Sequence, residues 1–461
     1  MIKKSKNHYK KEKFILYLSK LFILLVFSGS LYFMWTEYYN PYIPKPFYQY
    51  GNYLLLALFM GIYFAFVKVY GGFMVGTAQV HDLIFSQIIA IGFLQGISYI
   101  IFSLLSYDMV SPLPFIIMFI LFSAFASVWA LVVDAIYFRL HAPKKTVVVF
   151  ENIDSYLSLK GIRSMDKRFT VIRTFNSGKT SLAELFEQIS SVDAVFLCGV
   201  PSDYRNEVVK YCIANNKVAY VKPKISDTII RGGRTIQLMN VPVYRCKRSD
   251  VSLIYQAIKR FFDILLSLIA IIISSPIMLV TALAIRLYDG GPVFYKQVRL
   301  TLNGKEFEII KFRSMIQNAE KDGVARLAEN SDSRITPVGN IIRKLRIDEL
   351  PQLFNILKGD MSFVGPRPER PEIAAEYEKD MPEFALRLQV KAGLTGYAQV
   401  YGKYNTPPYD KVQMDLMYIA HQNILEDIKL MLITFKILFV PSSTEGVKAN
   451  QKTAKRENRK K

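Results

Sequence analysis

The chain has 461 residues, a net charge of +21, 51% apolar residues and 21% charged residues. Its mean hydropathy of +0.19 is too high for a simple soluble enzyme, and its charged fraction is too high for a pure transporter, so membrane and soluble domains are expected together. The three cysteines and four histidines show no metal-ligand spacing and give no support for a zinc hydrolase or a Ser-His-Asp enzyme.

The positive charge is concentrated in two short tails, at residues 1–13 and 448–461. A charge of this sign predicts an anionic partner: lipid headgroups, nucleic acid or phosphorylated substrates. Because both tails flank apolar sequence, we expect them to contact membrane lipid on the anionic cytoplasmic leaflet, and we expect no nucleic-acid partner.

The first 140 residues contain four apolar runs, each near the ~20 residues that a membrane-spanning helix needs. No small-residue cleavage site follows the first run, which predicts an anchor rather than a signal peptide. Six lysines precede the first run, three basic residues follow the fourth, and the two intervening outer loops hold one lysine and two acids. The positive-inside rule therefore predicts a four-helix transmembrane bundle with both ends in the cytoplasm. The four runs are 14–36, 52–70, 83–106 and 113–138.

Residues 145–248 alternate between short apolar runs and helical patterns, which predicts a parallel, Rossmann-like α/β domain. The first strand lacks the glycine-rich turn that binds a dinucleotide. Gly178-Lys179-Thr180 is a fragment of a phosphate-binding loop, but Arg173 stands where the complete pattern needs glycine, so we expect a surface turn. Strands are expected at 146–150, 168–172, 193–200 and 217–222, and helices at 181–191 and 206–216.

The apolar segment 259–291 is long enough to span a membrane, but basic residues flank it on both sides. Ser275-Pro276 interrupts the segment, and a proline inside a helix removes a hydrogen bond and bends the helix. A helix that enters one leaflet and turns back explains both features better than a fifth crossing does. The later apolar segment 425–441 carries two lysines and is expected to lie on the membrane interface.

A cluster of cations and two adjacent acids, Asp348 and Glu349, carries the expected chemistry. The acids open a predicted helix over 346–357. Cations around two carboxylates are typical of a diphosphate site with Mg²⁺, which prefers one or two carboxylates plus substrate phosphates. A carboxylate at a helix N-terminus is held ionised by the dipole and suits a nucleophile. The candidate phosphate-binding residues are Arg299, Lys311, Arg313, Arg343, Arg367 and Arg370.

These residues lie in segments that resemble the bacterial sugar transferase family, the polyprenol phosphate phosphoglycosyl transferases. The similar segments are KFRSM at 311–315, IDELPQLFNILKGDMSFVGPRP at 347–368 and KAGLTGYAQVYG at 391–402. The resemblance covers about residues 255–441. The N-terminal helices and the α/β domain resemble, in architecture, the long family members that initiate capsule or exopolysaccharide synthesis.

The resemblance implies an undecaprenyl-phosphate sugar-1-phosphate transferase at the cytoplasmic membrane. Asp348 would attack the β-phosphate of a UDP-sugar, release UMP and carry the phosphosugar until undecaprenyl phosphate accepts it. Glu349 would bind Mg²⁺, and Arg343 and Arg367 would hold phosphates. The break at Ser275-Pro276 resembles the re-entrant helix of the family. The identity of the sugar stays open, and a homodimer is a hypothesis.

The expected protein is thus a multidomain membrane protein: a transmembrane helical bundle over 1–140, a Rossmann-like α/β domain over 145–248, a re-entrant helix with a mainly α monotopic catalytic domain over 255–441, and a basic tail over 442–461. Two other functions compete. An inactive membrane scaffold would tolerate Asp348→Asn in cells, and a P-loop transporter would need nucleotide hydrolysis that depends on Lys179. One departure from the family is Thr301, where glycine is common.

Overall fold

The computed structural model describes residues 2–151, 167–248, 251–317, 334–402 and 406–437. These residues form two compact units, Met1–Lys222 and Pro223–Lys461, and each unit is described by itself. The predicted basic tail at 442–461 and the end of the segment 425–441 lie outside the described residues.

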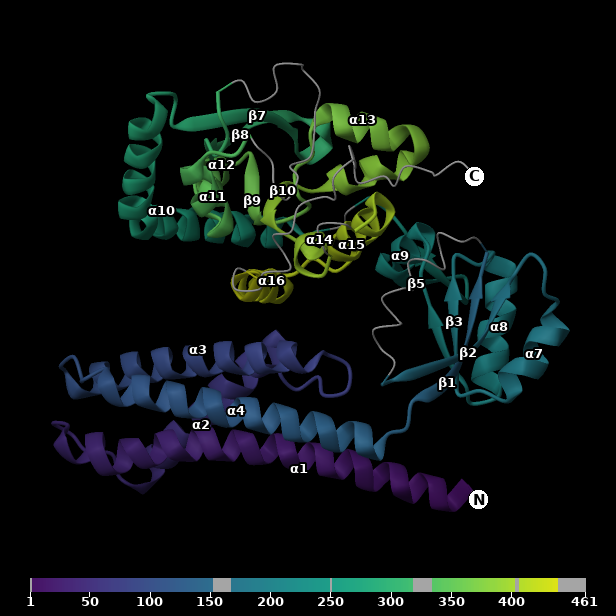
Figure 1. Cartoon of the computed structure of the whole chain (residues 1–461), viewed down its shortest axis with the longest axis horizontal. Helices are drawn as coiled ribbons and strands as arrows, with labels where there is room; N and C mark the ends of the chain where they lie inside the picture. Colours follow the sequence, from purple (N-terminus) through teal and green to yellow (C-terminus); the bar gives the residue numbers. More distant parts are fainter. Residues whose placement is uncertain (1, 152–166, 249–250, 318–333, 403–405, 438–461) are drawn as a thin grey trace. The chain divides into compact units, whose positions relative to one another are not determined.

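Four long helices open the first unit and run side by side (Figure 1). Each is long and apolar enough to cross a membrane, as is one helix of the second unit, and these five helices indicate a membrane-bound protein. Aromatic side chains fill the space between them: Phe27 stacks on Phe122, and Trp35, Phe59 and Phe102 are fully buried. The helices are α1 (Ile2–Met34), α2 (Gln49–Tyr70), α3 (Val80–Ser106) and α4 (Leu113–Leu140).

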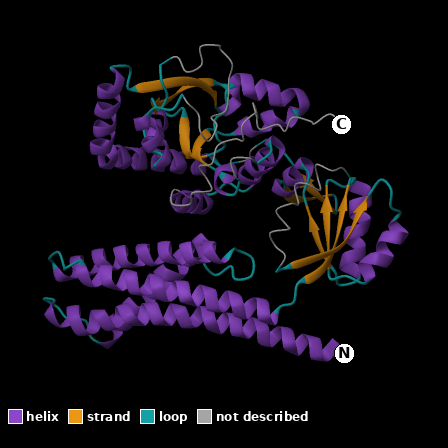
Figure 2. Ribbon diagram, viewed as in Figure 1, coloured by secondary structure: helices purple, strands orange, loops and turns teal. Residues whose placement is uncertain are grey.

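A parallel four-stranded sheet follows in the order β2-β1-β3-β4. Its two helices pack on one face (Figure 2), where Val147 and Val149 meet Leu185 and Val208. The predicted strands and helices are confirmed at their expected places. The central strands β1 and β3 are buried, as runs of β-branched and other apolar residues predict, whereas β2 and β4 at the edges are more exposed. The elements are β1 (Lys144–Phe150), β2 (Phe169–Asn176), α7 (Leu182–Ser190), β3 (Ala194–Cys198), α8 (Ser202–Ala214) and β4 (Val218–Val221).

The Gly178-Lys179-Thr180 fragment is a turn between β2 and α7, as predicted. The side chain of Asn176 accepts a hydrogen bond from the Gly178 N–H at 2.9 Å, which closes the turn locally. Lys179 is exposed at its tip. This geometry gives no support for a P-loop.

The second unit begins earlier than the expected catalytic domain. It includes α9 (Ile225–Gly232) and a hairpin of β5 (Arg234–Leu238) and β6 (Val241–Arg245). Ile225 packs into a cluster with Ile373 and Val412 of that unit. Helix α9 therefore packs against the second unit. The sequence pattern instead assigns residues up to 248 to the domain of the preceding sheet.

Helix α10 (Leu253–Asp289) contains Pro276 and is sharply bent (Figure 1). The Oγ of Ser275 donates to the carbonyl of Ile272 at 2.8 Å, so the predicted break lies within one bent helix. The N-terminal half of α10 is bound to the rest of the unit: Lys259 pairs with Asp427 at 2.8 Å, and Arg260 donates twice to carbonyls at the end of α12.

The remaining elements form a mainly helical unit around two short sheets. Phe307, Ile309, Leu353, Ile356 and Met361 form its central core. The antiparallel pair is β7 (Phe294–Leu300) with β8 (Glu306–Phe312), and the parallel pair is β9 (Met361–Val364) with β10 (Ala392–Thr395). The helices are α11 (Pro337–Lys344), α12 (Gln352–Lys358), α13 (Pro371–Asp380), α14 (Tyr397–Val400), α15 (Pro408–Ala420) and α16 (Ile424–Ile437), with short 3₁₀ segments η4 (Ile347–Glu349) and η5 (Pro382–Gln389).

Thr301, the departure from the resemblance noted above, follows β7. Its φ of −128° is extended backbone that any residue adopts. Its buried hydroxyl donates to the Asp360 carbonyl at 2.9 Å and accepts from the Ala392 N–H at 3.1 Å. The hydroxyl thus connects three segments, and the backbone here has no need of glycine.

Candidate active site

The two acids lie in a short 3₁₀ turn between two helices. Helix α11 ends at Lys344, Arg346 takes the left-handed conformation with φ 57°, and Ile347–Glu349 form the turn. Helix α12 begins only at Gln352, after Pro351. The predicted helix over 346–357 is therefore wrong in its first turn, because the left-handed residue interrupts it. A non-glycine residue in this region is uncommon and often marks a functional segment.

Glu349 is the anion on which three cations converge. Its Oε1 lies 3.1 Å from the Nζ of Lys311 and 3.0 Å from an Nη of Arg367, and its Oε2 lies 3.7 Å from Arg346. Burial alone would raise the pKa of this carboxyl. Lys311, Arg367 and Arg346 outweigh burial and hold the pKa of Glu349 well below its ordinary value. Glu349 is therefore ionised at neutral pH.

The pKa of the adjacent residue, Asp348, is shifted in the opposite direction. Burial, followed by the negative charge of Glu349, raises the pKa of Asp348 to about 6, although Lys311, Arg343 and Arg346 oppose the rise. The expectation that a helix dipole holds this carboxylate ionised is thus not met, since the residue precedes α12 by a full turn. Two neighbouring carboxyls with pKa values shifted apart are typical of sites that divide two chemical roles.

The Arg367 loop owes its position to close backbone packing. The N–H of Gly365 donates to the Thr395 carbonyl at 2.8 Å, and the N–H of Gly393 donates to the Pro366 carbonyl at 2.9 Å. A Cβ on Gly393 would lie 2.1 Å from the Gly365 nitrogen, so a side chain there would force the two segments apart. Glycine permits this approach.

The other predicted cations lie in two places. Arg299 donates to the Pro368 carbonyl at 3.3 Å and pairs with Glu369 at 3.5 Å, beside the Arg367 loop. Arg370 stands 3.8 Å from Glu372 at the start of α13. Arg313 is engaged by Asp289 at the end of α10, which gives it an internal partner. The structure brings Lys311, Arg343 and Arg367 to the acid pair, but supplies no contact between Arg313 and that pair.

Comparison with known proteins places the acid pair and its cations within a known protein family. Residues 254–441 match the family described as bacterial sugar transferase. The chain is 39% identical over 200 residues to the "Uncharacterized sugar transferase EpsL" of Bacillus subtilis (strain 168), an alignment that covers 43% of this chain and 95% of that protein. The chain belongs to the bacterial sugar transferase family. All residues of the acid-pair site lie inside the matched segment.

Two longer relatives of this sugar transferase carry more specific names. One is the UDP-N-acetylgalactosamine-undecaprenyl-phosphate N-acetylgalactosaminephosphotransferase of Aeromonas hydrophila, 45% identical over 188 residues, or 40% of this chain and 44% of that protein. The other is the UDP-glucose:undecaprenyl-phosphate glucose-1-phosphate transferase of Klebsiella pneumoniae, 36% identical over 235 residues, or 50% of each chain. The alignments span about half the length of these two relatives.

The acids of this sugar transferase fit the chemistry of a magnesium ligand set that the substrate completes. Within the described ranges, no three His, Cys, Asp or Glu side chains lie together. Asp348 and Glu349 supply two adjacent carboxylates, and Mg²⁺ takes one or two of these plus substrate phosphates. The low pKa of Glu349 suits a ligand that must be ionised to bind a metal.

Sequence reasoning placed Arg346 in the cation-rich run beside the acid pair but missed Arg387. Arg346 precedes Glu349 by three residues, which is a spacing that permits an ion pair on a helix or turn, but its left-handed backbone leaves no mark in the sequence. Arg387 lies far along the chain and contacts the backbone of Arg367 at 2.9 Å. No local pattern predicts a bond to a main-chain oxygen twenty residues away.

Proposed function

We propose that this protein transfers a sugar-1-phosphate from a UDP-sugar to undecaprenyl phosphate, releases UMP, and so initiates exopolysaccharide or capsule synthesis. The observation that carries the proposal is the adjacent pair Asp348 and Glu349: Lys311, Arg367 and Arg346 lie 3.0–3.7 Å from Glu349 and keep it ionised. Burial and the charge of Glu349 raise the pKa of Asp348 beside it. The names of the Aeromonas and Klebsiella relatives support the donor and acceptor classes.

In the first step the Asp348 carboxylate attacks the β-phosphorus of the UDP-sugar. A bond forms between a carboxylate oxygen and that phosphorus, while the bond from the β-phosphorus to the bridging oxygen breaks. UMP leaves with the bonding electron pair, and the sugar phosphate remains as an acyl phosphate on Asp348. In this role Asp348 must be ionised, as most of it is at neutral pH with a pKa of about 6; Lys311, Arg343 and Arg346 limit the rise that burial and Glu349 cause.

In the second step a phosphate oxygen of undecaprenyl phosphate attacks the same phosphorus. The bond between phosphorus and Asp348 breaks, the carboxylate is restored, and undecaprenyl-diphospho-sugar is formed. Lys311, Arg343 and Arg367 hold the phosphate oxygens, because fixed cations stabilise the negative charge of phosphoryl transfer without reorganisation. The half-exposed guanidinium of Arg367 is placed to meet a substrate from outside.

Glu349 would hold Mg²⁺ in this proposal. The ion, when bound, supplies positive charge to the diphosphate and leaving group. Glu349 itself stays ionised and orients the guanidinium of Arg367 at 3.0 Å and the ammonium of Lys311 at 3.1 Å. It thereby arranges two cations of the site.

The proposal also includes the position of the catalytic domain at the membrane. Helix α10 is a re-entrant helix that holds a monotopic catalytic domain at the cytoplasmic face, where both substrates meet. Its bend and the internal proline support this topology over a straight crossing. The parallel sheet is a Rossmann-like domain used for contacts, and helices α1–α4 form a four-helix anchor.

The proposal is tested with purified protein, Mg²⁺ and a panel of UDP-sugars, with and without undecaprenyl phosphate. We expect UMP release and, by intact mass, a phosphosugar adduct that is absent in Asp348→Asn. Glu308→Gln is the matched control, since that carboxyl is 60% exposed on β8. UMP release without an adduct would favour direct transfer. No release with any donor, together with intact cellular function of Asp348→Asn, would favour the inactive scaffold.

We also propose a homodimer, which the apparent lack of a ligand motif in the sheet domain and the family resemblance support. Analytical ultracentrifugation in detergent, with and without the sheet residues 145–222, tests it, since residues from 223 onward belong to the second unit. Monomers in both cases would refute it.

A further inference from the structure

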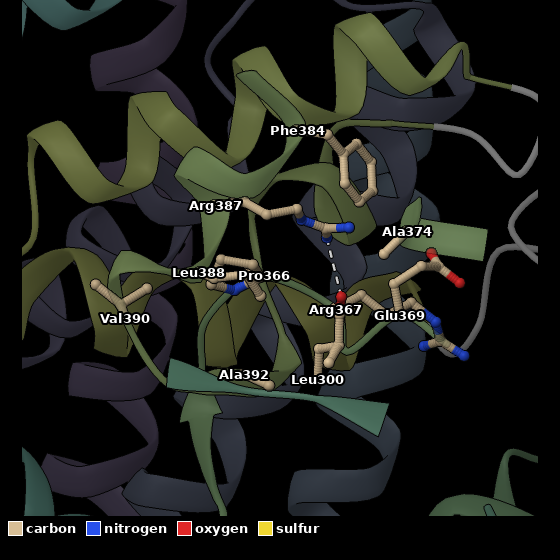
Figure 3. Close-up of a pocket in the computed structure, with 10 residues that line it drawn as sticks. All are labelled: Leu300, Pro366, Arg367, Glu369, Ala374, Phe384, Arg387, Leu388, Val390 and Ala392. Atoms are coloured by element: carbon tan, nitrogen blue, oxygen red, sulfur yellow. Dashed lines mark hydrogen bonds between the residues drawn. The ribbon is translucent and has the colours of Figure 1, made fainter. Parts of the chain in front are cut away.

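A buried arginine lies behind the loop that carries Arg367. Arg387, in η5, is 4% exposed, and one of its Nη atoms donates to the main-chain oxygen of Arg367 at 2.9 Å. The same nitrogen lies 2.8 Å from Oδ2 of Asp415. The guanidinium also stands over the ring of Phe384 at 4.9 Å. Figure 3 shows Arg387 directed at the Arg367 carbonyl, with the ring beside it.

Arg367 is thus held from behind while its side chain points the other way. Its carbonyl accepts the bond from Arg387, and its guanidinium, 45% exposed, reaches Glu349 at 3.0 Å. The prolines on both sides fix two backbone angles, but the peptide between them still has freedom to rotate. A bond to the carbonyl of Arg367 removes that freedom at the residue whose side chain meets the acid pair.

The choice of arginine fits this geometry. One terminal nitrogen of its planar guanidinium lies against both the Arg367 carbonyl and the Asp415 carboxylate, and the plane fixes the direction of its N–H groups, which a freely rotating lysine ammonium does not. A buried ion pair is also weak support for stability, because well-packed apolar residues often replace such a pair without loss. The pair of Arg387 with Asp415, whose side chain is 1% exposed, is therefore better explained by orientation than by stability.

We propose that Arg387 is a positioning residue: with Asp415 it fixes the backbone of Arg367 so that the Arg367 guanidinium stays on the acid pair. Arg387 touches neither acid and acts only through Arg367. The proposal deepens the proposed function and, for its kinetic test, rests on it.

The kinetic test is a double-mutant cycle. Arg387→Lys, and Arg387→Gln combined with Asp415→Asn, are each made in the wild-type and in the Arg367→Ala background. The combined variant leaves no buried charge without its partner, so it guards against failure to fold. We expect about a tenfold fall in kcat for UMP release in the wild-type background, the size of one lost bond to a charged donor. In the Arg367→Ala background the same changes have less than about a twofold effect, since their target is gone.

A second measurement requires no activity. Amide hydrogen exchange of peptides that span residues 361–370 reports opening of the loop. We expect faster exchange there in both Arg387 variants, and no change in the exposed control Arg231→Lys, which makes the same exchange of side chain on α9.

The outcomes separate the two proposals. Equal kinetic losses in both backgrounds, or unchanged exchange in the loop, would overturn the role of Arg387. Absence of UMP release by the wild type with every donor would instead count against the proposed function, and the exchange measurement would still decide whether Arg387 holds the loop.

Discussion

Neutralising each of the two adjacent acids by substitution is expected to change the stability of the folded protein in opposite directions. The pKa of Asp348 is raised from its ordinary value of 3.8 to about 6, so ionising it destabilises the folded protein. One pKa unit corresponds to about 1.4 kcal/mol, which gives about 3 kcal/mol as an upper limit at pH 8. Asp348→Asn removes this cost. We expect the variant to be inactive and yet more stable than the wild type.

The pH dependence of the Asp348→Asn effect follows from linkage. A carboxyl with a raised folded pKa binds its proton more tightly in the folded state, so its ionisation costs stability fully above about pH 6. This cost shrinks as the pH falls and disappears below the ordinary value of 3.8. At pH 5 the stabilisation by Asp348→Asn should be about half of that at pH 8.

Glu349→Gln is the matched comparison, because its shift has the opposite sign. Lys311, Arg367 and Arg346 overcome the effect of burial and lower the pKa of Glu349, so its ionised form stabilises the fold above its ordinary pKa and this contribution is lost as the pH falls. Removal of one partner from a buried ion pair costs about 3 kcal/mol or more. Glu349→Gln should therefore destabilise the second unit at pH 8, while Asp348→Asn stabilises it.

The assay must report on the second unit alone. Both tryptophans, Trp35 and Trp129, lie in the first unit, so tryptophan fluorescence serves as an internal control that should not shift. Heating followed by brief proteolysis and mass spectrometry of peptides from residues 223–461 gives the midpoint of interest. For a domain of this size a change of 1 kcal/mol shifts the midpoint by about 2–4 °C. Shifts of the same sign for both variants would refute the reasoning.

Three further predictions use the same site and its supports. The rate of UMP release should fall about tenfold per pH unit below pH 6 as Asp348 takes up its proton, and a flat profile down to pH 5 would exclude it as the ionised nucleophile. Lys311→Met should lower kcat/KM at least about a hundredfold, since it removes a fixed cation from the acid pair; Lys296→Met on the exposed strand β7 is the control, and equal losses would show a general charge effect. Thr301→Val should destabilise the second unit by about 2–4 kcal/mol because two buried backbone groups lose their partner, Thr301→Ser should not, and equal midpoints for both would contradict the bridging role.

Much of the fold follows from residue patterns that are local. The four N-terminal helices are apolar over lengths that fit a membrane, and β1 and β3 are runs of buried β-branched and aromatic residues, so their hydropathy alone predicts them. The start of the second unit at Pro223 could not be predicted from the sequence. Helix α9 is amphipathic, and its sequence does not show which surface covers its apolar face.

Within the site, the sequence identifies the acids but not the partner of each cation. Arg313 lies two residues after Lys311, yet one is held by Asp289 and the other by Glu349. Within a strand such residues would point to the same face, but β8 ends at Phe312 and Arg313 lies beyond it, so the backbone after the strand separates the two side chains. That separation depends on tertiary packing, as does the left-handed backbone of Arg346, and neither is encoded in spacing.

The convergence on Glu349 explains why its neighbour is the better candidate nucleophile. Lys311 comes from a strand thirty-eight residues before it and Arg367 from a loop eighteen residues after it, so two distant segments are committed to one carboxylate. Consecutive residues in a 3₁₀ turn point about 120° apart, so Asp348 shares these cations only at longer range and also faces the charge of Glu349. A carboxylate that is less compensated is more basic, and greater basicity favours attack on phosphorus. The strongly paired acid is then suited to hold cations, while the weakly paired acid is suited to form the bond.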